Sequence, residues 1–415
     1  MFHSRHCSRP IAGAALAASL LLAAPFTGAQ AADAPDPADW PAVLDAAQGQ
    51  TVYFHAWGGE PRINSYIAWA GERLKELHGV SVEQVKVDDT ANVVARVVAE
   101  KAAGQDTGGA VDLVWINGEN FVSLKKAGLL MTPGWATKLP NWDLVDTTDK
   151  PAVLTDFTEP TDGLESPWGM AKLVFMHDTA TLTHAPTTLA ALAEYLKAHP
   201  GRFTYPQPPN FHGSTFLKQV LATTIADKTK LTKPVDPASF ESDVAPLFAW
   251  LDALHPTMWR QGRAFPQNQP AMRQLLADGE IDIAFTFNPA GASAAIAAGE
   301  LPDTVRTFVL DGGTIGNAHF LAIPYNANAK AGALVLANFL LSAEAQARKQ
   351  DPTIWGDPTV LAIDALSDAD KARFAALDLG IATLAPQQLG PVIDEPHASW
   401  MTALERAWTA RYASQ

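Results

Sequence analysis

The stretch TVYFHAWGGEPRINSYIAWAGERLKELHGVSVEQVKV, residues 51–87, decides the expected fold. Thr51–Trp57 is rich in β-branched and aromatic residues and ends at a Gly-Gly pair, which is typical of a strand. Ile63–Leu77 carries apolar residues at helical spacing, and Val80–Val87 is again strand-like. Strand–helix–strand units form right-handed crossovers between parallel strands. This stretch therefore predicts an α/β protein with a mostly parallel sheet.

The alternation of strands and helices continues along the chain. Asn92–Lys101 predicts a helix and Val111–Ile116 a third strand, and a second, similar unit begins after Trp168–His177. In this second unit we expect a strand at Arg202–Tyr205, a helix from Thr215 to about Ile225, a surface loop over 226–245 and a helix over Ala271–Asp278. From residue 331 onward the pattern is mainly helical and begins with a helix over 331–350. Because the chain exceeds the size at which a single core stops growing, we expect two lobes. The predicted divisions are a signal peptide (1–31), the first part of lobe one (32–172), lobe two (173–321), and the return to lobe one with the C-terminal helices (322–415).

The N-terminal segment predicts export. Arg5 and Arg9 precede the apolar run Ile11–Ala24, and Ala29-Gln30-Ala31 supplies a small–x–small cleavage pattern. The apolar run is too short for a membrane span, so the alternative of a short anchor is the weaker one. The only cysteine, Cys7, precedes the apolar run and is not placed for lipid attachment at the cleavage site. We therefore expect a periplasmic protein without a lipid anchor.

Composition excludes several classes of partner. The whole chain has a net charge of −14, and the segment before the predicted cleavage site holds two arginines and no acidic residue, so the mature chain reaches −16. A chain this acidic repels nucleic acid and anionic lipid. The mature chain has no cysteine, which excludes a disulfide scaffold and a thiolate metal site.

Recognised catalytic motifs are missing from the sequence. It contains no G-x-S-x-G, H-E-x-x-H, P-loop or G-x-G-x-x-G pattern. A secreted hydrolase acting through two carboxylates stays open as an alternative, because carboxylate pairs have no local motif. A structural adhesin is a third possibility, for which strand–helix alternation is the wrong pattern. We expect a protein that is not an enzyme and that holds neither a cofactor nor a metal.

Polar, aromatic and glycine-rich turns follow the predicted strands. In open α/β sheets, ligands bind at the carboxyl ends of the strands, so these turns are the candidate site. The candidate ligand-binding residues are Trp57, Gly58, Gly59, Glu60, Asn117, Glu119, Trp168, Phe211, Ser214, Thr215, Asn288, Thr314 and Asn317.

Each group has a structural alternative. Asn-Gly and Gly-Gly are ordinary turn sequences, and Ser214 or Thr215 could simply cap a helix. Trp57 and Trp168 could be core aromatics. Glu119 could be a favourable charge in the first turn of a helix. Five such turns coincide with ends of predicted strands, and this coincidence favours a shared cleft; the turns are residues 57–60, 117–120, 211–216, 288–289 and 312–317.

Four segments carry a family resemblance: DLVWINGENF (112–121), ESPWG (165–169), TYPQPPNFHGSTFL (204–217) and LANFLLSAEAQARK (336–349). With them, the sequence resembles ABC-transporter periplasmic solute-binding proteins of the two-lobed class that includes iron, thiamine and polyamine binders. The resemblance implies a type II-like periplasmic binding protein fold with two crossing hinge strands, near Lys172–His177 and His319–Pro324, and a helical C-terminus.

The resemblance also implies partners. A small-molecule ligand would close the two lobes about the hinge, and the closed form would dock onto an ABC permease and its ATPase; we expect a monomer. The ferric members use adjacent tyrosines, and this chain has no Tyr-Tyr pair. Thiamine-type members stack the ligand on aromatics beside a carboxylate, which Trp57, Trp168, Phe211, Glu60 and Glu119 could supply. Helix N-termini near Ser214 and Asn117 favour an anion instead, but the carboxylates favour a cationic organic solute that is thiamine- or polyamine-like.

Overall fold

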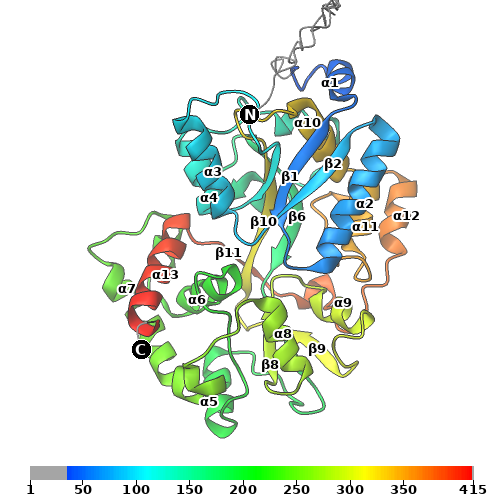
Figure 1. Cartoon of the computed structure of the whole chain (residues 1–415). Helices are drawn as coiled ribbons and strands as arrows, with labels where there is room; N and C mark the ends of the chain where they lie inside the picture. The colour runs from blue at the N-terminus through cyan, green and yellow to red at the C-terminus, as the bar shows by residue number, and fades with distance from the viewer. Residues whose placement is uncertain (1–34, 414–415) are drawn as a thin grey trace, which may run out of the picture. The chain divides into compact units, whose positions relative to one another are not determined.

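The computed structural model describes residues 35–413 (Figure 1). The predicted signal peptide, residues 1–31, lies outside the described residues. Among the residues that are described, no helix combines the length and the apolar composition that a membrane span needs. These residues form two large hydrophobic cores, which define what we call the first and second lobes, and a small third cluster of Val122, Phe157, Ala398 and Met401.

The sheet of the first lobe is mostly parallel around its centre, as residues 51–87 predict. Its order is β11-β10-β3-β1-β2, with β6 paired to β10. β1 runs parallel to both β2 and β3, whereas β10 runs antiparallel to β3 and β6. The strands are β1 (Thr51–Trp57), β2 (Ser81–Val87), β3 (Leu113–Ile116), β6 (Glu165–Lys172), β10 (Thr314–Ala322) and β11 (Val392–Asp394).

Helices cover this sheet, and their buried faces follow the apolar spacing of the sequence. In α2 (Pro61–His78), Ile63, Ile67, Ala70 and Leu74 are buried. The other helices of the first lobe are α1 (Trp40–Ala47), α3 (Ala91–Ala102), α4 (Glu119–Lys126), α10 (Lys330–Leu340), α11 (Ala343–Gln350) and α12 (Asp368–Ala375). A two-strand hairpin, β4 (Thr155–Asp156) and β5 (Glu159–Pro160), and several 3-10 turns complete it.

The second lobe is built differently from the first. Its three-stranded sheet, in the order β8-β7-β9, is antiparallel, so the parallel pairing of the first unit is not repeated. The predicted strand Arg202–Tyr205 forms only a single bridge, from Phe203 to Ile283. The elements are β7 (Val174–Asp178), β8 (Ile283–Thr286), β9 (Val305–Phe308), α5 (Leu189–Ala198), α6 (Phe211–Thr224), α7 (Phe240–Leu254), α8 (Gln269–Ala277), α9 (Gly291–Ala297) and α13 (Ala398–Tyr412).

Two strands pass between the cores, as the sequence implied. In β6 and just beyond it, Trp168 belongs to the first core and Leu173 to the second. In β10, Ile315 belongs to the second core and Phe320 to the first, so this crossing precedes the expected position at His319–Pro324. β6 and β10 pair with each other through Gly316↔Lys172.

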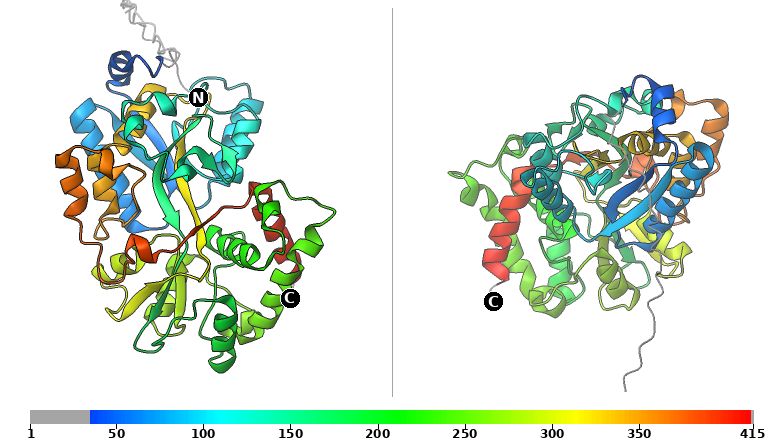
Figure 2. Two further views of the ribbon diagram at one scale, coloured as in Figure 1. Left: turned by 180° about the vertical axis from the view of Figure 1, so that it is seen from behind. Right: turned by 45° about the horizontal axis from the view of Figure 1, so that its top comes forward.

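The C-terminal part requires a correction. The sequence placed all of 322–415 with lobe one, but a third segment crosses after α12. Trp400, Leu404 and Trp408 of α13 pack into the second core, and α13 lies beside α6 in both views of Figure 2. The apolar face of α13 has its partners on α6 and α7, for instance Phe248 beside Tyr412. The apolar spacing of a sequence predicts that a helix has a buried face, but it does not predict which of the two cores that face packs against.

Candidate functional site

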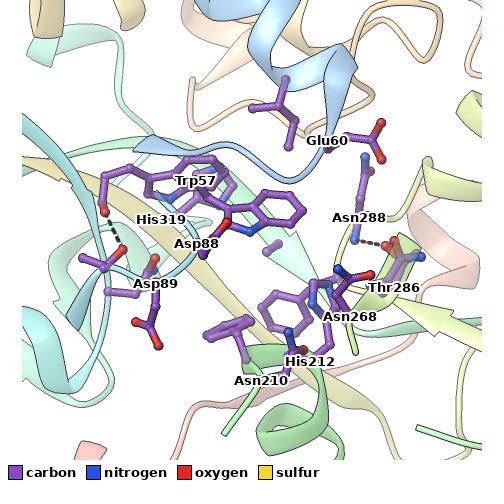
Figure 3. A pocket seen from close by; sticks show the side chains of 18 of the residues that line it. Trp57, Glu60, Asp88, Asp89, Asn210, His212, Asn268, Thr286, Asn288 and His319 are labelled. Carbon is purple, nitrogen blue, oxygen red and sulfur yellow. Dashed lines mark hydrogen bonds between the residues drawn. The ribbon is translucent and has the colours of Figure 1, made fainter. Parts of the chain in front are cut away.

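A cavity of about 610 Å³ opens between the two lobes. Its walls come from the ends of β1, β2, β3 and β8, from the N-terminus of α6 and from the crossing strand β10. Figure 3 shows Trp57 between Asp89 on one side and Asn288 on the other. The residues of the sequence prediction that line the cavity are Trp57, Glu60, Asn117, Glu119, Phe211, Asn288 and Asn317.

Gly58 and Gly59 do not line the cavity, but they shape its wall. A Cβ on Gly59 would lie 2.4 Å from the Trp57 ring, and one on Gly58 would lie 2.6 Å from Cβ of Lys86. Neither distance is possible for a real side chain. Gly59 therefore leaves room for the Trp57 indole, and Gly58 leaves room for the Lys86 side chain of β2.

Trp168 is a core residue, as the structural alternative had it. It is fully buried and does not line the cavity. Its ring packs edge-on against Trp115 and Trp355 at 5.0 and 5.3 Å between centroids, and both of those tryptophans line the cavity. Trp168 supports the cavity wall from behind.

Ser214, Thr215 and Thr314 are also buried away from the cavity. The helix that was expected to begin at Thr215 begins at Phe211, because the side chain of Asn210 caps it by accepting from the His212 amide at 3.0 Å. This earlier start places Ser214 and Thr215 inside the helix rather than at its cap. Thr314 is fully buried at the start of β10.

Several lining residues were not predicted. Asp88 and Asp89 directly follow β2, so they obey the same strand-end rule that located Trp57. Asn268 caps α8, which was expected as a helix, and Arg273 lies within that helix. Glu405 lies on α13 and has no local signal. The unpredicted lining residues used below are Arg62, Asp88, Asp89, Trp115, Asn268, Arg273, His319, Trp355, Asp357 and Glu405.

Three carboxylates form what we call the acidic wall: Asp89 and Glu119 from the first lobe and Glu405 from the second. Burial raises the pKa of Glu119 to about 7, and the charges of Glu405 and Asp89 act in the same direction. The Lys218 ammonium lowers that pKa in part, but it is bound to Glu395 at 2.6 Å. Within residues 35–413, no lysine or arginine forms an ion pair with the acidic wall.

Glu405 is positioned by Ser214, which the sequence analysis had expected to line the cavity itself. The Ser214 hydroxyl donates to Glu405 Oε1 at 2.6 Å. Burial raises the pKa of Glu405, and the hydrogen bond from Ser214 lowers it in part. Ser214 thus acts on the cavity through Glu405.

Glu60, in contrast, is engaged by basic side chains. Arg273 Nη1 donates to Glu60 Oε2 at 3.0 Å, and Arg62 Nε lies 3.5 Å from Glu60 Oε1. The carboxylate expected to meet a ligand beside Trp57 is therefore neutralised by protein groups.

A buried ion pair lies at the back of the cavity. His319 Nε2 and Lys349 Nζ lie 3.0 and 2.5 Å from the same Asp357 oxygen, and the Trp355 ring stacks on His319. A Cβ on Gly169 would overlap Asp357 and His319, so only glycine fits there. Among the described residues there is no group of three or more His, Cys, Asp or Glu side chains suited to a metal ion.

The fold and the cleft define the class of protein. Residues 69–362 match the sequence model of the family of bacterial extracellular solute-binding proteins, and the chain belongs to that family. A curated relative, Protein YnjB of Escherichia coli K12, is 46% identical over 376 residues, which cover 91% of this chain and 94% of that protein.

Solved periplasmic binding proteins share the fold. The Tp0655 (TpPotD) lipoprotein of Treponema pallidum superposes with a TM-score of 0.63 at 14% identity, covering 87% of this chain and 98% of that one. AfuA of Actinobacillus pleuropneumoniae, bound to fructose-6-phosphate, gives 0.60 at 14% identity (88% and 99%). PotD of Streptococcus pneumoniae, a spermidine/putrescine substrate-binding protein, gives 0.58 at 15% (88% and 99%).

These findings confirm the family resemblance and the two-lobed α/β binding-protein fold. They also confirm that the chain is a solute-binding protein of this family, with a small-molecule ligand. Proteins of this family and fold bind substrates and are not enzymes, so the hydrolase and adhesin alternatives are excluded.

Proposed function

We propose that the cleft captures a cationic organic solute, held between the Trp57 indole and the acidic wall. The observation that carries this proposal is the placing of Asp89, Glu119 and Glu405 in one cavity, while the neighbouring basic groups Lys218 and Arg273 form their ion pairs with Glu395 and Glu60. Carboxylates that face one another in a partly desolvated cavity repel, and a ligand cation between them removes the repulsion. Because the acidic wall draws on both lobes, the same cation would favour closure.

Aromatic side chains support the same ligand class. Trp57, Trp115 and Phe211 line the cavity and are each partly exposed to it. An aromatic face attracts an ammonium or a cationic ring, with tryptophan the strongest of the three types. The amides of Asn268 and Asn288 lie across the cavity from Asp89 and offer hydrogen bonds to a polar body (Figure 3).

The solved neighbours do not decide the charge of the ligand. Two carry the name PotD, one of them as a spermidine/putrescine binder, and another holds fructose-6-phosphate on the same fold. The proposed charge therefore rests on the side chains of this cleft. Among the described lining residues, Asp89, Glu119 and Glu405 are carboxylates outside the ion pairs, whereas Arg62 and Arg273 are paired with Glu60.

The test is a ligand panel followed by calorimetry. We expect spermidine, putrescine, thiamine or choline to raise the melting temperature and to bind 1:1, because a ligand of the folded state stabilises it by mass action. Phosphate, sulfate and citrate should give no shift. The matched control is the double variant Glu119→Gln/Glu405→Gln, which keeps size and removes charge. Tight binding of an anion with no cation bound would overturn the cationic ligand but not the binding-protein class.

We further propose that the mature chain acts in the periplasm as an unanchored monomer after cleavage behind Ala31. It would deliver its solute to a permease powered by an associated ATPase. N-terminal sequencing of the periplasmic fraction tests the cleavage, and light scattering tests the monomer. A lipid-modified or membrane-retained product would contradict the proposal that the mature chain is unanchored. A stable dimer would contradict the proposal that it is a monomer.

A further inference from the structure

Four charged side chains meet across one side of the cleft. Glu60 and Arg62 come from the turn after β1 and the first turn of α2, in the first lobe. Arg273 lies on α8, and Glu300 follows α9, in the second lobe. We call this group of four the clasp.

The clasp contains two kinds of ion pair. Within the lobes, Arg62 Nε lies 3.5 Å from Glu60 Oε1, and Arg273 Nη2 lies 2.9 Å from Glu300 Oε2. Between the lobes, Arg273 Nη1 lies 3.0 Å from Glu60 Oε2, and Arg62 Nη2 lies 3.7 Å from Glu300 Oε2. Separation of the lobes breaks the second kind and leaves the first intact.

Burial makes the interlobe pair of Glu60 and Arg273 more than a surface contact. Their side chains are only 11% and 14% exposed. Partial removal from water strengthens the attraction of a close pair, whereas fully exposed pairs contribute little. Each carboxylate keeps one arginine from its own lobe after opening, so opening leaves no charge wholly unpaired.

We infer that the clasp is a built-in device that stabilises the closed form through the Glu60–Arg273 pair, independently of any ligand. Arg273 is the positioning residue, because it bonds to the acidic side chains of both lobes. The clasp has two acidic and two basic members, so it adds no net charge to the cavity. Closure by the clasp and ligand selection by the acidic wall are therefore separate properties, and the inference does not rest on the sign of the ligand charge.

The test measures the closed-to-open ratio of the ligand-free protein. Spin labels at Glu76→Cys on α2 and Lys197→Cys on α5, in the Cys7→Ser chain, report the distance between the lobes by pulsed electron spin resonance. Arg273→Gln should lower the closed-to-open ratio about five- to tenfold, the size expected for one close pair between two surfaces. Salt at 1 M should lower the closed-to-open ratio of the protein with the unmutated clasp, and it should lower that of Arg273→Gln less, because only the Arg62–Glu300 pair then joins the lobes.

The matched control is Lys101→Gln, which removes one positive charge and an ion pair inside the first lobe. It should leave the distance distribution unchanged. Glu60→Gln should resemble Arg273→Gln, and the double variant should shift the ratio no further than the larger single change. Circular dichroism establishes that each variant is folded. Equal distance distributions for the unmutated clasp and Arg273→Gln, or fully additive shifts in the double variant, would overturn the inference.

Discussion

The acidic wall lines the same cavity as three members of the clasp, Glu60, Arg62 and Arg273, and the two groups differ in the partners of their carboxylates. Glu119 and Glu405 face other acidic groups, whereas Glu60 is held by two arginines. Glu60 and Glu119 both follow a strand and begin a helix, so their sequence surroundings are alike. A carboxylate at a strand end is thus available to a ligand only where the opposite lobe brings no base to it.

Removing the charge of the acidic wall should have the largest effect on ligand binding. Glu119→Gln/Glu405→Gln should weaken binding of the panel's best cation about 100-fold, because two charge-assisted contacts are lost. Glu60→Gln should weaken it far less and without changing the preference for cations. Isothermal calorimetry on all three proteins checks this. An equal loss of cation affinity in the acidic-wall variant and in Glu60→Gln would show that the acidic wall and Glu60 do not differ in ligand binding.

Variants of Trp57 test whether an aromatic face contributes to cation affinity together with the acidic wall. Trp57→Ala should lower cation affinity about 20-fold through the loss of stacking and cation–π attraction. Trp57→Phe should recover part of the loss. The comparison with Trp168→Ala is instructive, because that change should lower the melting temperature instead. Titrations of the folded Trp57 variants decide the point, and an unchanged affinity would assign Trp57 to the fold alone.

The pKa of Glu119, raised to about 7 by burial, predicts a pH dependence of binding. Below that pH the carboxyl is protonated and neutral, and above it the carboxylate attracts a cation. Affinity for a cation of fixed charge should therefore rise about fivefold from pH 6 to pH 8. Glu119→Gln should flatten this profile, whereas Glu60→Gln should keep it. A fall in affinity over the same range would have the wrong sign for a cation site.

Ser214 gives the smallest expected effect. Ser214→Ala removes the hydrogen bond to Glu405 and should weaken cation binding about two- to threefold. In the Glu405→Gln variant, adding Ser214→Ala should lower cation affinity by a smaller factor, because the carboxylate that Ser214 orients is no longer present. Calorimetry of the four proteins of this cycle measures the coupling. Strict additivity would assign Ser214 to packing.

Local sequence carried much of the fold. β1 occupies the predicted residues, and α2 extends the predicted helix by a few, since alternation and apolar spacing are local properties. Two boundaries were nevertheless predicted wrongly. The expected helix over 331–350 is two helices, because Ser342 caps a new one at Ala343, and 226–245, expected as a loop, contains the start of α7.

The site divides in the same way. Trp57 is the last residue of β1 and Asn117 directly follows β3, so the strand-end rule identifies both from the sequence alone, and Asp89 obeys the same rule just after β2. Glu405 could not be found, because it reaches the cavity through the third crossing of the chain, nearly three hundred residues from Glu119. The sequence around Glu405 does not indicate that the chain crosses between the lobes before it.

One feature of β10 bears on how such a cleft can change its ligand. This strand passes from one core to the other, and two of its residues, Asn317 and His319, also line the cavity. A rotation of the lobes about the crossing strands moves the residues at the crossing least. Asn317 lies at the crossing in β10 and His319 lies two residues beyond it. We therefore expect a solute to meet these two side chains at nearly the same positions at first encounter and after capture. Changes elsewhere in the cleft alter what is held after closing, whereas changes at these two positions alter what is recognised at arrival.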